Sequence, residues 1–335
     1  MSQEKVGQQQ TIMSRYLIIV LGATLVINLL SAYIRHIEAG IGCEDWPQCY
    51  GLIGQYVQAA NESEIARKAL APTQMAKRTH RGIATILVIA VLLLVHHSRR
   101  VRMTPGLSRT LPYAMLGVLL LLAVVGPASY LKTLPIIAVV NLVGGLSLLA
   151  IAWWLWLQLS VPLVTSRRQS PPWLRSLARS GWVLLLLQII LGIWVSASFS
   201  GLACTELTSC SNAGVDFSSA SNSSGFFQKL ALNDNGHVLF SSSSVTIHLL
   251  HRIGAIITGL ILFASAVSVL RHFSSQRPLA TTASCIIVLL AVQCLLGVTG
   301  IVLSLPLLVV LTHNLVATLL MLAVMALNYQ LQLPG

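Results

Sequence analysis

Five of the nine histidines lie beside the ends of long apolar segments, and we expect them all at one depth: His36, His80, His248, His251 and His313. Imidazole nitrogens that project from facing helices into a bundle core are ligands for haem iron. The two histidines of this set that best fit this arrangement are His251 and His313. His248 precedes His251 by three residues and shares nearly the same helix face, so it is an alternative ligand or a contact for the haem edge or a propionate.

A single histidine at such a boundary is more simply explained as an interfacial side chain bonded to a carbonyl group or to water. The pair of His251 and His313 is what favours ligation, because their helices are expected to face each other. In the first half of the chain, His80 matches His251, but the segment that begins near Pro135 carries Asn141 and no histidine. A neutral amide is a poor ligand for haem iron, so this site offers one strong ligand and an open position.

Long apolar helices must position these side chains. The chain of 335 residues is 55% hydrophobic and only 9% charged, whereas soluble domains carry roughly a quarter charged residues. The first apolar segment is too long for a signal peptide and lacks a small-residue cleavage site, so we interpret it as a retained helix. We predict an all-α integral membrane protein with eight spans, near residues 16–34, 82–97, 111–130, 134–157, 181–199, 247–270, 281–303 and 306–327.

The net charge of +12 follows a membrane pattern and does not indicate nucleic-acid binding. Arginines gather in alternate connectors, as the positive-inside rule describes. This pattern predicts a multi-pass protein of the plasma (inner) membrane, with both termini cytoplasmic and the histidine sites near the outer face. The arginines concerned are Arg99, Arg100, Arg102, Arg109, Arg167, Arg168, Arg175, Arg179, Arg271 and Arg277.

The two halves of the chain repeat. The separation between His80-Arg81 and His251-Arg252 is the same as the separation between Pro135 and Pro306. Each half contains four predicted spans, an even number, so the second half re-enters the membrane from the same side as the first. We therefore expect two parallel-repeat four-helix bundles, the first unit in residues 1–160 and the second in residues 161–335.

Two pairs of cysteines lie in the predicted outer loops, at Cys43 and Cys49 and at Cys204 and Cys210, with five residues between the members of each pair. Both loops face a compartment that tolerates disulfides. Zinc is the alternative, but neither loop combines its cysteines with closely spaced histidines. Disulfides are therefore favoured.

The acidic residues restrict the class of function. All nine lie outside the apolar segments, whereas a proton-pumping or ion-coupled transporter usually needs a carboxylate within the membrane. Secondary transport is therefore disfavoured, and an unrelated quinol-linked membrane cytochrome remains as another alternative.

The run from Arg35 to Gly51 resembles the first outer loop of the haem A synthases, whose pattern is approximately T-R-x-T-x-[AS]-G-x-x-C-P-D-W-P-x-C-x-G. The resemblance fixes an arginine, two glycines, a Trp-Pro pair and two cysteines within this one short run. It extends over nearly the whole chain through His80-Arg81, the second cysteine pair, His251-Arg252 and His313-Asn314.

This resemblance implies oxidation of the C8 methyl group of haem O to a formyl group, which makes haem A for terminal oxidases. It implies haem b in the second unit, ligated by His251 and His313, and haem O or haem A as substrate or product in the first. It also implies disulfides in both outer loops. Implied partners are a haem O-producing farnesyltransferase and a terminal oxidase, with an unidentified membrane electron donor and possible homo-oligomers. The expected residues are His80, Arg81 and Asn141 for catalysis, with His80 also as an iron ligand, and His248, Arg252 and Arg35 for cofactor binding.

Two departures from the family pattern fall in the first unit. The family's second helix usually begins E-x-x-H-R, with a glutamate important to activity, and here Lys77 replaces that glutamate. Asn141 replaces the histidine of the fourth helix. Two functions therefore stay open: an active haem A synthase with an altered substrate site, or a non-catalytic haem-b-binding paralogue. The paralogue would act in oxidase assembly, haem delivery or electron transfer.

Overall fold

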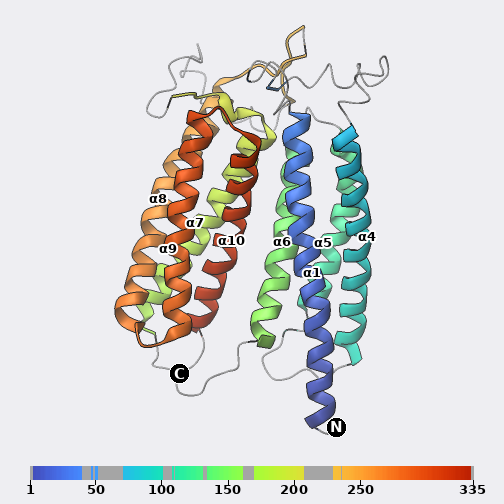
Figure 1. Ribbon diagram of the computed structural model, residues 1–335, viewed down its shortest axis with the longest axis vertical. Coiled ribbons are helices and arrows are strands. Elements are labelled where there is room, and N and C mark those ends of the chain that lie inside the picture. Colours follow the sequence, from blue (N-terminus) through green and yellow to red (C-terminus); the bar gives the residue numbers. More distant parts are fainter. Residues whose placement is uncertain are drawn as a thin grey trace.

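The computed structural model is built from long, roughly parallel helices (Figure 1). It describes residues 3–39, 47, 50–51, 71–100, 108, 110–130, 134–160, 170–206, 229–234 and 236–332. Within these residues, eight helices are long and apolar enough to cross a membrane, which confirms the predicted all-α, eight-span fold. They are α1 (Gln3–Glu38), α4 (Ala71–Arg100), α5 (Leu111–Val125), α6 (Pro135–Ser160), α7 (Pro172–Ala197), α8 (Ser242–Phe273), α9 (Arg277–Val302) and α10 (Leu307–Gln332).

Local sequence explains where several helices begin. Proline occupies the first turn of α5, α6, α7 and α9, where its missing N–H group costs no helical hydrogen bond. A capping box starts α8, because Ser241 accepts from the backbone of Ser244 and the Ser244 side chain accepts from the backbone of Ser241. Two short 3-10 helices, η1 (Gly126–Tyr130) and η2 (Ser200–Leu202), directly follow α5 and α7.

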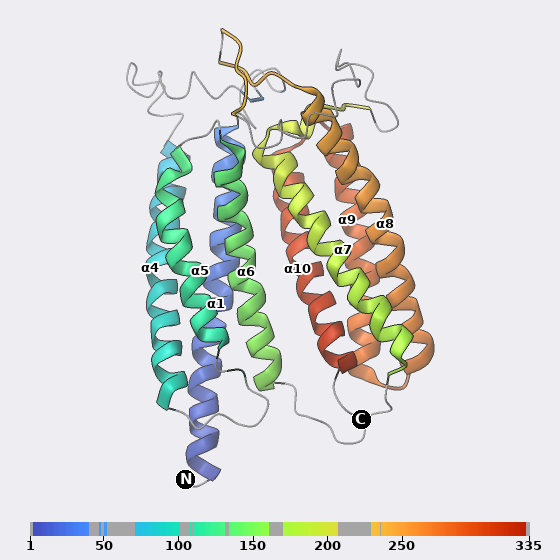
Figure 2. The same ribbon diagram turned by 180° about the vertical axis from the view of Figure 1, so that it is seen from behind.

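The eight helices pack as two groups of four (Figures 1 and 2). Helices α1, α4, α5 and α6 pack against one another, as do α7, α8, α9 and α10. Each group has its own apolar core, with Leu17, Leu94 and Met115 in the first and Leu174 and Ile286 in the second. This is the arrangement of two four-helix bundles that the repeat predicts.

Helix α6 joins the two bundles. Its neighbouring residues Leu148 and Leu149 enter the first and second cores respectively. Trp153 of α6 donates its indole N–H to the carbonyl oxygen of Leu322 in α10 at 2.9 Å. The next residue, Trp154, packs edge-on against Tyr329 of α10 with ring centroids 5.3 Å apart. These contacts fix the two bundles against each other within the apolar layer.

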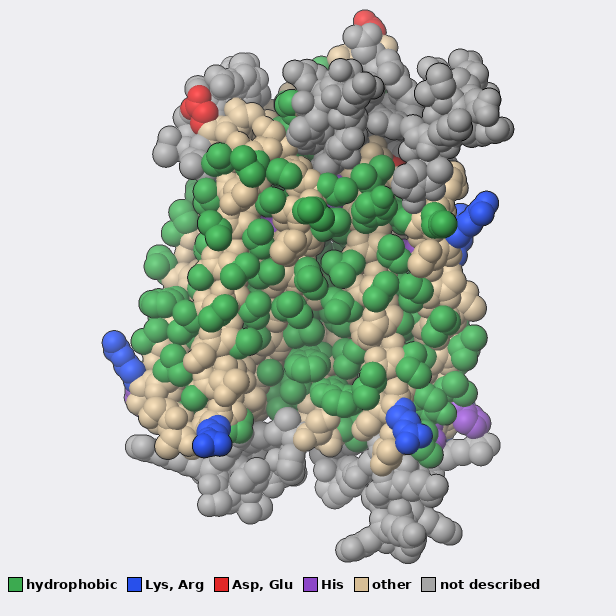
Figure 3. All heavy atoms as spheres, in the orientation of Figure 1, with side chains coloured by type: hydrophobic (Ala, Val, Ile, Leu, Met, Phe, Trp, Pro, Cys, Tyr) green, Lys and Arg blue, Asp and Glu red, His purple; other side chains and the backbone are tan. Residues whose placement is uncertain are grey.

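Hydrophobic side chains cover the middle of the molecular surface, and most of the visible Lys and Arg side chains lie near one end (Figure 3). The start of α1 and the end of α10 lie at that same end (Figure 1). Such a surface suits a molecule solvated by lipid around its waist. The chain is therefore a multi-pass membrane protein.

The helices extend further into the polar regions than the apolar segments alone indicate. His80 and His251 were expected beside the ends of long apolar segments and hence near the ends of their helices, but each lies about two and a half turns inside, in α4 and α8. The expectation was wrong because a helix satisfies its own backbone hydrogen bonds and does not end where hydrophobicity ends. Both histidines consequently sit on rigid, fully helical backbone.

Candidate haem site

The second bundle brings His251 and His313 together from different helices. His251 lies on α8 and His313 on α10, and the two imidazoles are near enough to interact electrostatically. Neither side chain is exposed. The structure therefore places the two predicted haem ligands on facing helices in one bundle core.

His251 packs against α7. Its Nδ1 atom lies 2.9 Å from Nε2 of Gln188, and the same Nε2 donates to the carbonyl oxygen of His251 at 2.8 Å. One turn further along α7, Gly192 faces the ring, and a Cβ atom there would lie 2.9 Å from Cε1 of His251. Only a glycine lets the imidazole approach α7 this closely.

His313 packs against α9 in the same manner. Its Nε2 atom lies 3.0 Å from Nε2 of Gln293. Four residues later in α9, a Cβ atom at Gly297 would lie 3.4 Å from Cε1 of His313. Each histidine therefore has a glutamine and a glycine from the preceding helix beside it, and sequence reasoning missed both glutamines. The signal that was available is a glutamine four residues before a glycine in an otherwise apolar helix.

The buried polar atoms of this site fit a ligated haem. Nδ1 of His313, Oε1 of Gln188 and Oε1 of Gln293 are buried and have no hydrogen-bond partner among the described residues. Leaving such groups without partners in an apolar interior is costly. A ligating imidazole uses one nitrogen for the metal and donates from the other to a nearby acceptor, so iron ligation gives these atoms partners. The residues present fit haem in this bundle.

The other predicted cofactor residues of the second unit, Arg252 and His248, lie beside the segment that follows α7. Arg252 donates to the carbonyl oxygens of Cys204 at 2.6 Å and Glu206 at 2.7 Å. His248 is buried at 5% exposure, beside the backbone of Ser200. The cofactor contacts expected of Arg252 and His248 stay predictions.

Arg35 crosses from the first bundle to the second. It lies near the end of α1, and its Nε atom donates to the hydroxyl oxygen of Ser196 in α7 at 2.9 Å. Beside it, Tyr50 hydrogen-bonds the backbone of Gly201, and burial raises the pKa of Tyr50 to about 12. The first outer segment is thus attached to the second bundle, so Arg35 belongs to the boundary between the units.

In the first bundle, His80 lies beside α1. Its Nε2 atom is 3.0 Å from the hydroxyl oxygen of Ser31. At the sequence offset between the two cysteine pairs, Ser31 is the repeat equivalent of Gly192, the residue that faces His251. His80 and His251 therefore face matching positions of matching helices, although Ser31 supplies a hydrogen bond where Gly192 supplies space. Arg81, the next predicted residue, is exposed.

Lys77 is paired with a carboxylate from another helix. Its Nζ atom lies 2.5 Å from Oε1 of Glu38, the last residue of α1. Along α1, Glu38 follows Ser31 by two turns, and along α4, Lys77 precedes His80 by nearly one turn. The Glu38–Lys77 pair therefore joins the same two helices as the Ser31–His80 pair, closer to the end of α1 and the start of α4. The first unit has a carboxylate near His80, contributed by α1.

The predicted site residue Asn141 lies half-buried on α6. At the sequence offset that relates His80 to His251, Leu142 is the repeat equivalent of His313, and Asn141 is the repeat equivalent of Thr312. At the same offset, Leu122 is the repeat equivalent of Gln293. In the structure, Leu122 packs against Gly144 of α6, where an added Cβ atom would lie 2.6 Å from Cδ2 of Leu122. The two positions that correspond to His313 and Gln293 therefore carry apolar side chains in the first unit, while the amide of Asn28 in α1 lies against Gly145 of α6.

The outer-loop cysteines are mostly beyond the described residues. Cys43, Cys49 and Cys210 lie outside them, so the two pairings stay predictions. Cys204 is described and is 1% exposed. Within the described part of the chain, the free thiols are those of Cys285 and Cys294 on α9.

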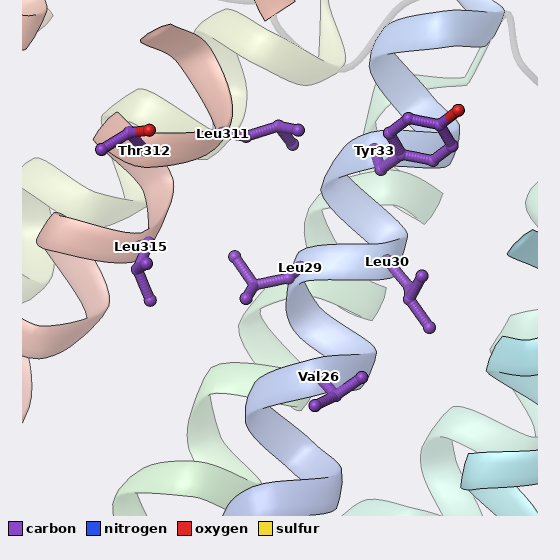
Figure 4. Close-up of a pocket in the computed structure, with 7 residues that line it drawn as sticks. All are labelled: Val26, Leu29, Leu30, Tyr33, Leu311, Thr312 and Leu315. Atoms are coloured by element: carbon purple, nitrogen blue, oxygen red, sulfur yellow. The ribbon is translucent and has the colours of Figure 1, made fainter. Parts of the chain in front are cut away.

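An apolar groove of about 360 Å³ lies between the bundles, where α1 faces α10 (Figure 4). Leucine side chains from both helices point into it, and Tyr33 and Thr312 add hydroxyl groups. The full lining is Val26, Leu29, Leu30, Tyr33, Leu311, Thr312 and Leu315.

Comparison with known proteins agrees with this architecture. A family model described as COX15-CtaA, cytochrome oxidase assembly protein, matches residues 14–325. A protein named Heme A synthase from Shewanella oneidensis is 32% identical over 312 residues, which cover 91% of this chain and 92% of that protein. Heme A synthase from Caulobacter vibrioides is 31% identical over 135 residues, covering 39% of this chain and 38% of its own. With eight spans and paired histidines in the expected bundle, the chain belongs to the COX15-CtaA family of cytochrome oxidase assembly proteins.

Proposed function

We propose that this protein is an oxidoreductase that converts the C8 methyl group of haem O to a formyl group. Family membership and 32% identity to a Heme A synthase over 91% of the chain support this activity. The observation that carries the proposal is the juxtaposition of His251 and His313, each held against a neighbouring helix by a glutamine. Such a pair suits a permanently bound haem, as an enzyme that oxidises a second haem requires.

The second unit is the proposed haem b site. A bis-histidine haem supplies one-electron transfer when bound. His251 and His313 would hold its iron, and Arg252 and His248 would be available for contacts with the rest of the cofactor. Arg35 links the second unit to the first through Ser196, so the boundary between the two sites is a fixed structure.

The first unit is the proposed site for haem O. His80, oriented by Ser31, supplies one ligand, and the apolar residues at the positions matching His313 and Gln293 leave the opposite side without a strong one. Glu38, paired with Lys77, contributes the carboxylate that the family pattern places on the second helix. A carboxylate there can accept a proton or hold a water molecule. Lys77 therefore does not by itself remove this function.

The proposed setting is the plasma (inner) membrane with cytoplasmic termini. The basic connectors support this orientation, and it puts both histidine sites near the outer face. Haem O comes from a membrane farnesyltransferase, and the product serves a terminal oxidase. A membrane electron donor and self-association complete the proposed partners.

The test is expression in cells that make haem O but lack their own haem A synthase, followed by haem extraction and chromatography. New haem A is expected from the native protein. His80→Ala should abolish the new haem A while leaving the low-spin spectrum of the second unit in place, because the two ligands of that site are unchanged. Haem b without haem A from the native protein would overturn the synthase proposal.

That last outcome would favour the non-catalytic paralogue. The observation that favours a paralogue is that the first unit has Leu142 and Leu122 at the positions where the second unit has His313 and Gln293. A paralogue would still give a low-spin haem b spectrum dependent on His251. The same extraction therefore separates the two functions.

A further inference from the structure

We propose that Gln188 and Gln293 are positioning residues that fix the planes of the two axial imidazoles and set the redox potential of the second-unit haem. This inference rests on the proposed haem site. Each glutamine lies four residues before a glycine, Gly192 on α7 and Gly297 on α9. Residues four apart share a helix face, so each pair presents one amide and one gap to the histidine of the next helix.

The two pairs form matching cradles. In both, a glycine faces the imidazole and the amide reaches a ring nitrogen, Nδ1 of His251 at 2.9 Å and Nε2 of His313 at 3.0 Å. The approach is closer at Gly192, where an added Cβ atom would lie 2.9 Å from the ring, than at Gly297, where it would lie 3.4 Å away. Contact on the ring edge and a hydrogen bond on a ring nitrogen together restrict rotation about the Cβ–Cγ bond. In the internal repeat, α7 corresponds to α1 and α9 corresponds to α5, so α7 and α9 are not repeat equivalents of each other. The shared spacing therefore does not follow from the duplication.

Packing also holds the amide of Gln188. A Cβ atom at Gly254 of α8 would collide with Oε1 of Gln188, so this glycine makes room for the amide. Both glutamines keep a buried Oε1 without a partner within the described part of the chain. Once the metal takes one nitrogen of an imidazole, the other carries a hydrogen and needs an acceptor. A half-turn of either amide supplies that oxygen, although at Gln188 it gives up the bond to the carbonyl oxygen of His251.

The first unit lacks this device. At the offset that relates the two cysteine pairs, Ile27 corresponds to Gln188. At the offset that relates His80 to His251, Leu122 corresponds to Gln293. Neither side chain can hydrogen-bond an imidazole. The difference suits the two proposed uses: a resident haem with fixed ligand planes in one unit, and an exchangeable haem in the other.

The acceptor on a ligating imidazole also controls its electron donation. A stronger acceptor makes the ring a better donor and stabilises the oxidised iron, so the potential falls. Gln188→Leu and Gln293→Leu should therefore raise the midpoint potential of the haem, and Gln188→Glu and Gln293→Glu should lower it. A purely structural role predicts no such opposition of sign.

The experiment uses the purified full-length holoprotein and measures midpoint potential, low-temperature EPR g values and haem transfer to apomyoglobin. Both leucine variants should broaden the low-spin signal and weaken haem retention about ten- to a hundredfold, the usual cost of removing such a partner. Gln330→Leu is the matched control, because this glutamine of α10 bonds Thr282 at 3.2 Å and not a histidine. It should leave all three readings unchanged.

The outcomes separate the inference from the function on which it rests. A native protein without a low-spin haem spectrum would refute the proposed haem site itself. A native low-spin spectrum that the leucine and glutamate variants leave unaltered would overturn only the inference. Shifts of the same sign for leucine and glutamate would assign the glutamines to packing and would also overturn it.

Discussion

Replacing Gly192 with alanine places a methyl group against the imidazole of His251. The new Cβ atom would lie 2.9 Å from Cε1 of the ring, roughly 0.6 Å inside the optimal separation of two carbon atoms. The ring cannot turn away freely, because its Nδ1 atom is 2.9 Å from Gln188. Either the hydrogen bond lengthens or α7 and α8 move apart.

The cost follows from this crowding. Overpacking a well-packed site costs about 1–3 kcal/mol, and about 1.4 kcal/mol corresponds to tenfold in affinity. Haem retention in the second unit should therefore fall about 5- to 150-fold. At Gly297 the corresponding Cβ atom would lie 3.4 Å from Cε1 of His313, close to ordinary contact, so Gly297→Ala should change retention less than about threefold.

The assay is haem transfer from the purified variants to apomyoglobin, with haem per protein measured by pyridine haemochrome. Gly259→Ala is the matched control, since it lies on α8 and its nearest neighbour is Leu290 Cδ1 at 3.9 Å. It also corrects for the gain in helix propensity that alanine brings, about 1 kcal/mol. The reasoning is refuted if Gly192→Ala keeps its haem as well as Gly259→Ala does, or if Gly297→Ala loses more than Gly192→Ala.

Further perturbations test the remaining assignments. His251→Ala and His313→Ala should each remove or strongly alter the low-spin b-type spectrum, and an unchanged spectrum in both would contradict the ligand assignment. The four outer-loop cysteines should resist alkylation in native protein until reduced, with each closed loop contributing about 2–3 kcal/mol locally; ready labelling of all four would show them to be free. Glu38→Gln should lower haem A yield about 100-fold while changing stability by no more than about 1 kcal/mol, and exchanging Glu38 and Lys77 should restore part of the yield that Glu38→Lys loses. Equal yields in native protein and Glu38→Gln would remove the carboxylate from the proposed chemistry. Leu142→His should raise the amount of haem retained by the first unit, measured as haem per protein, more than Asn141→His does. The reverse order would favour position 141 as the equivalent of His313.

The sequence by itself determined the spans and the repeat. Long apolar segments in lipid must be helical, because every backbone polar group needs a partner inside the segment. The repeated offset of His80 and His251 then assigned these two residues to matching helices before any contact was known. The limits of the apolar segments, however, misplaced the helix ends, since hydrophobicity marks the apolar layer and not the limits of helical hydrogen bonding.

Only the tertiary structure decided which side chains meet. Glu38 and Lys77 pair from different helices, far apart along the chain, and sequence comparison registered only the lysine in place of a glutamate. Gln188 and Gln293 looked like isolated polar residues in apolar helices until the packing of α7 on α8 and α9 on α10 brought each to a histidine. The hydrogen bond from Arg35 to Ser196 of the other bundle was likewise not predictable from the sequence, while its expected contact with a cofactor stays a prediction. Spacing along one helix predicts faces, but which face meets which neighbour depends on helix packing, and no local pattern in the sequence encodes that choice.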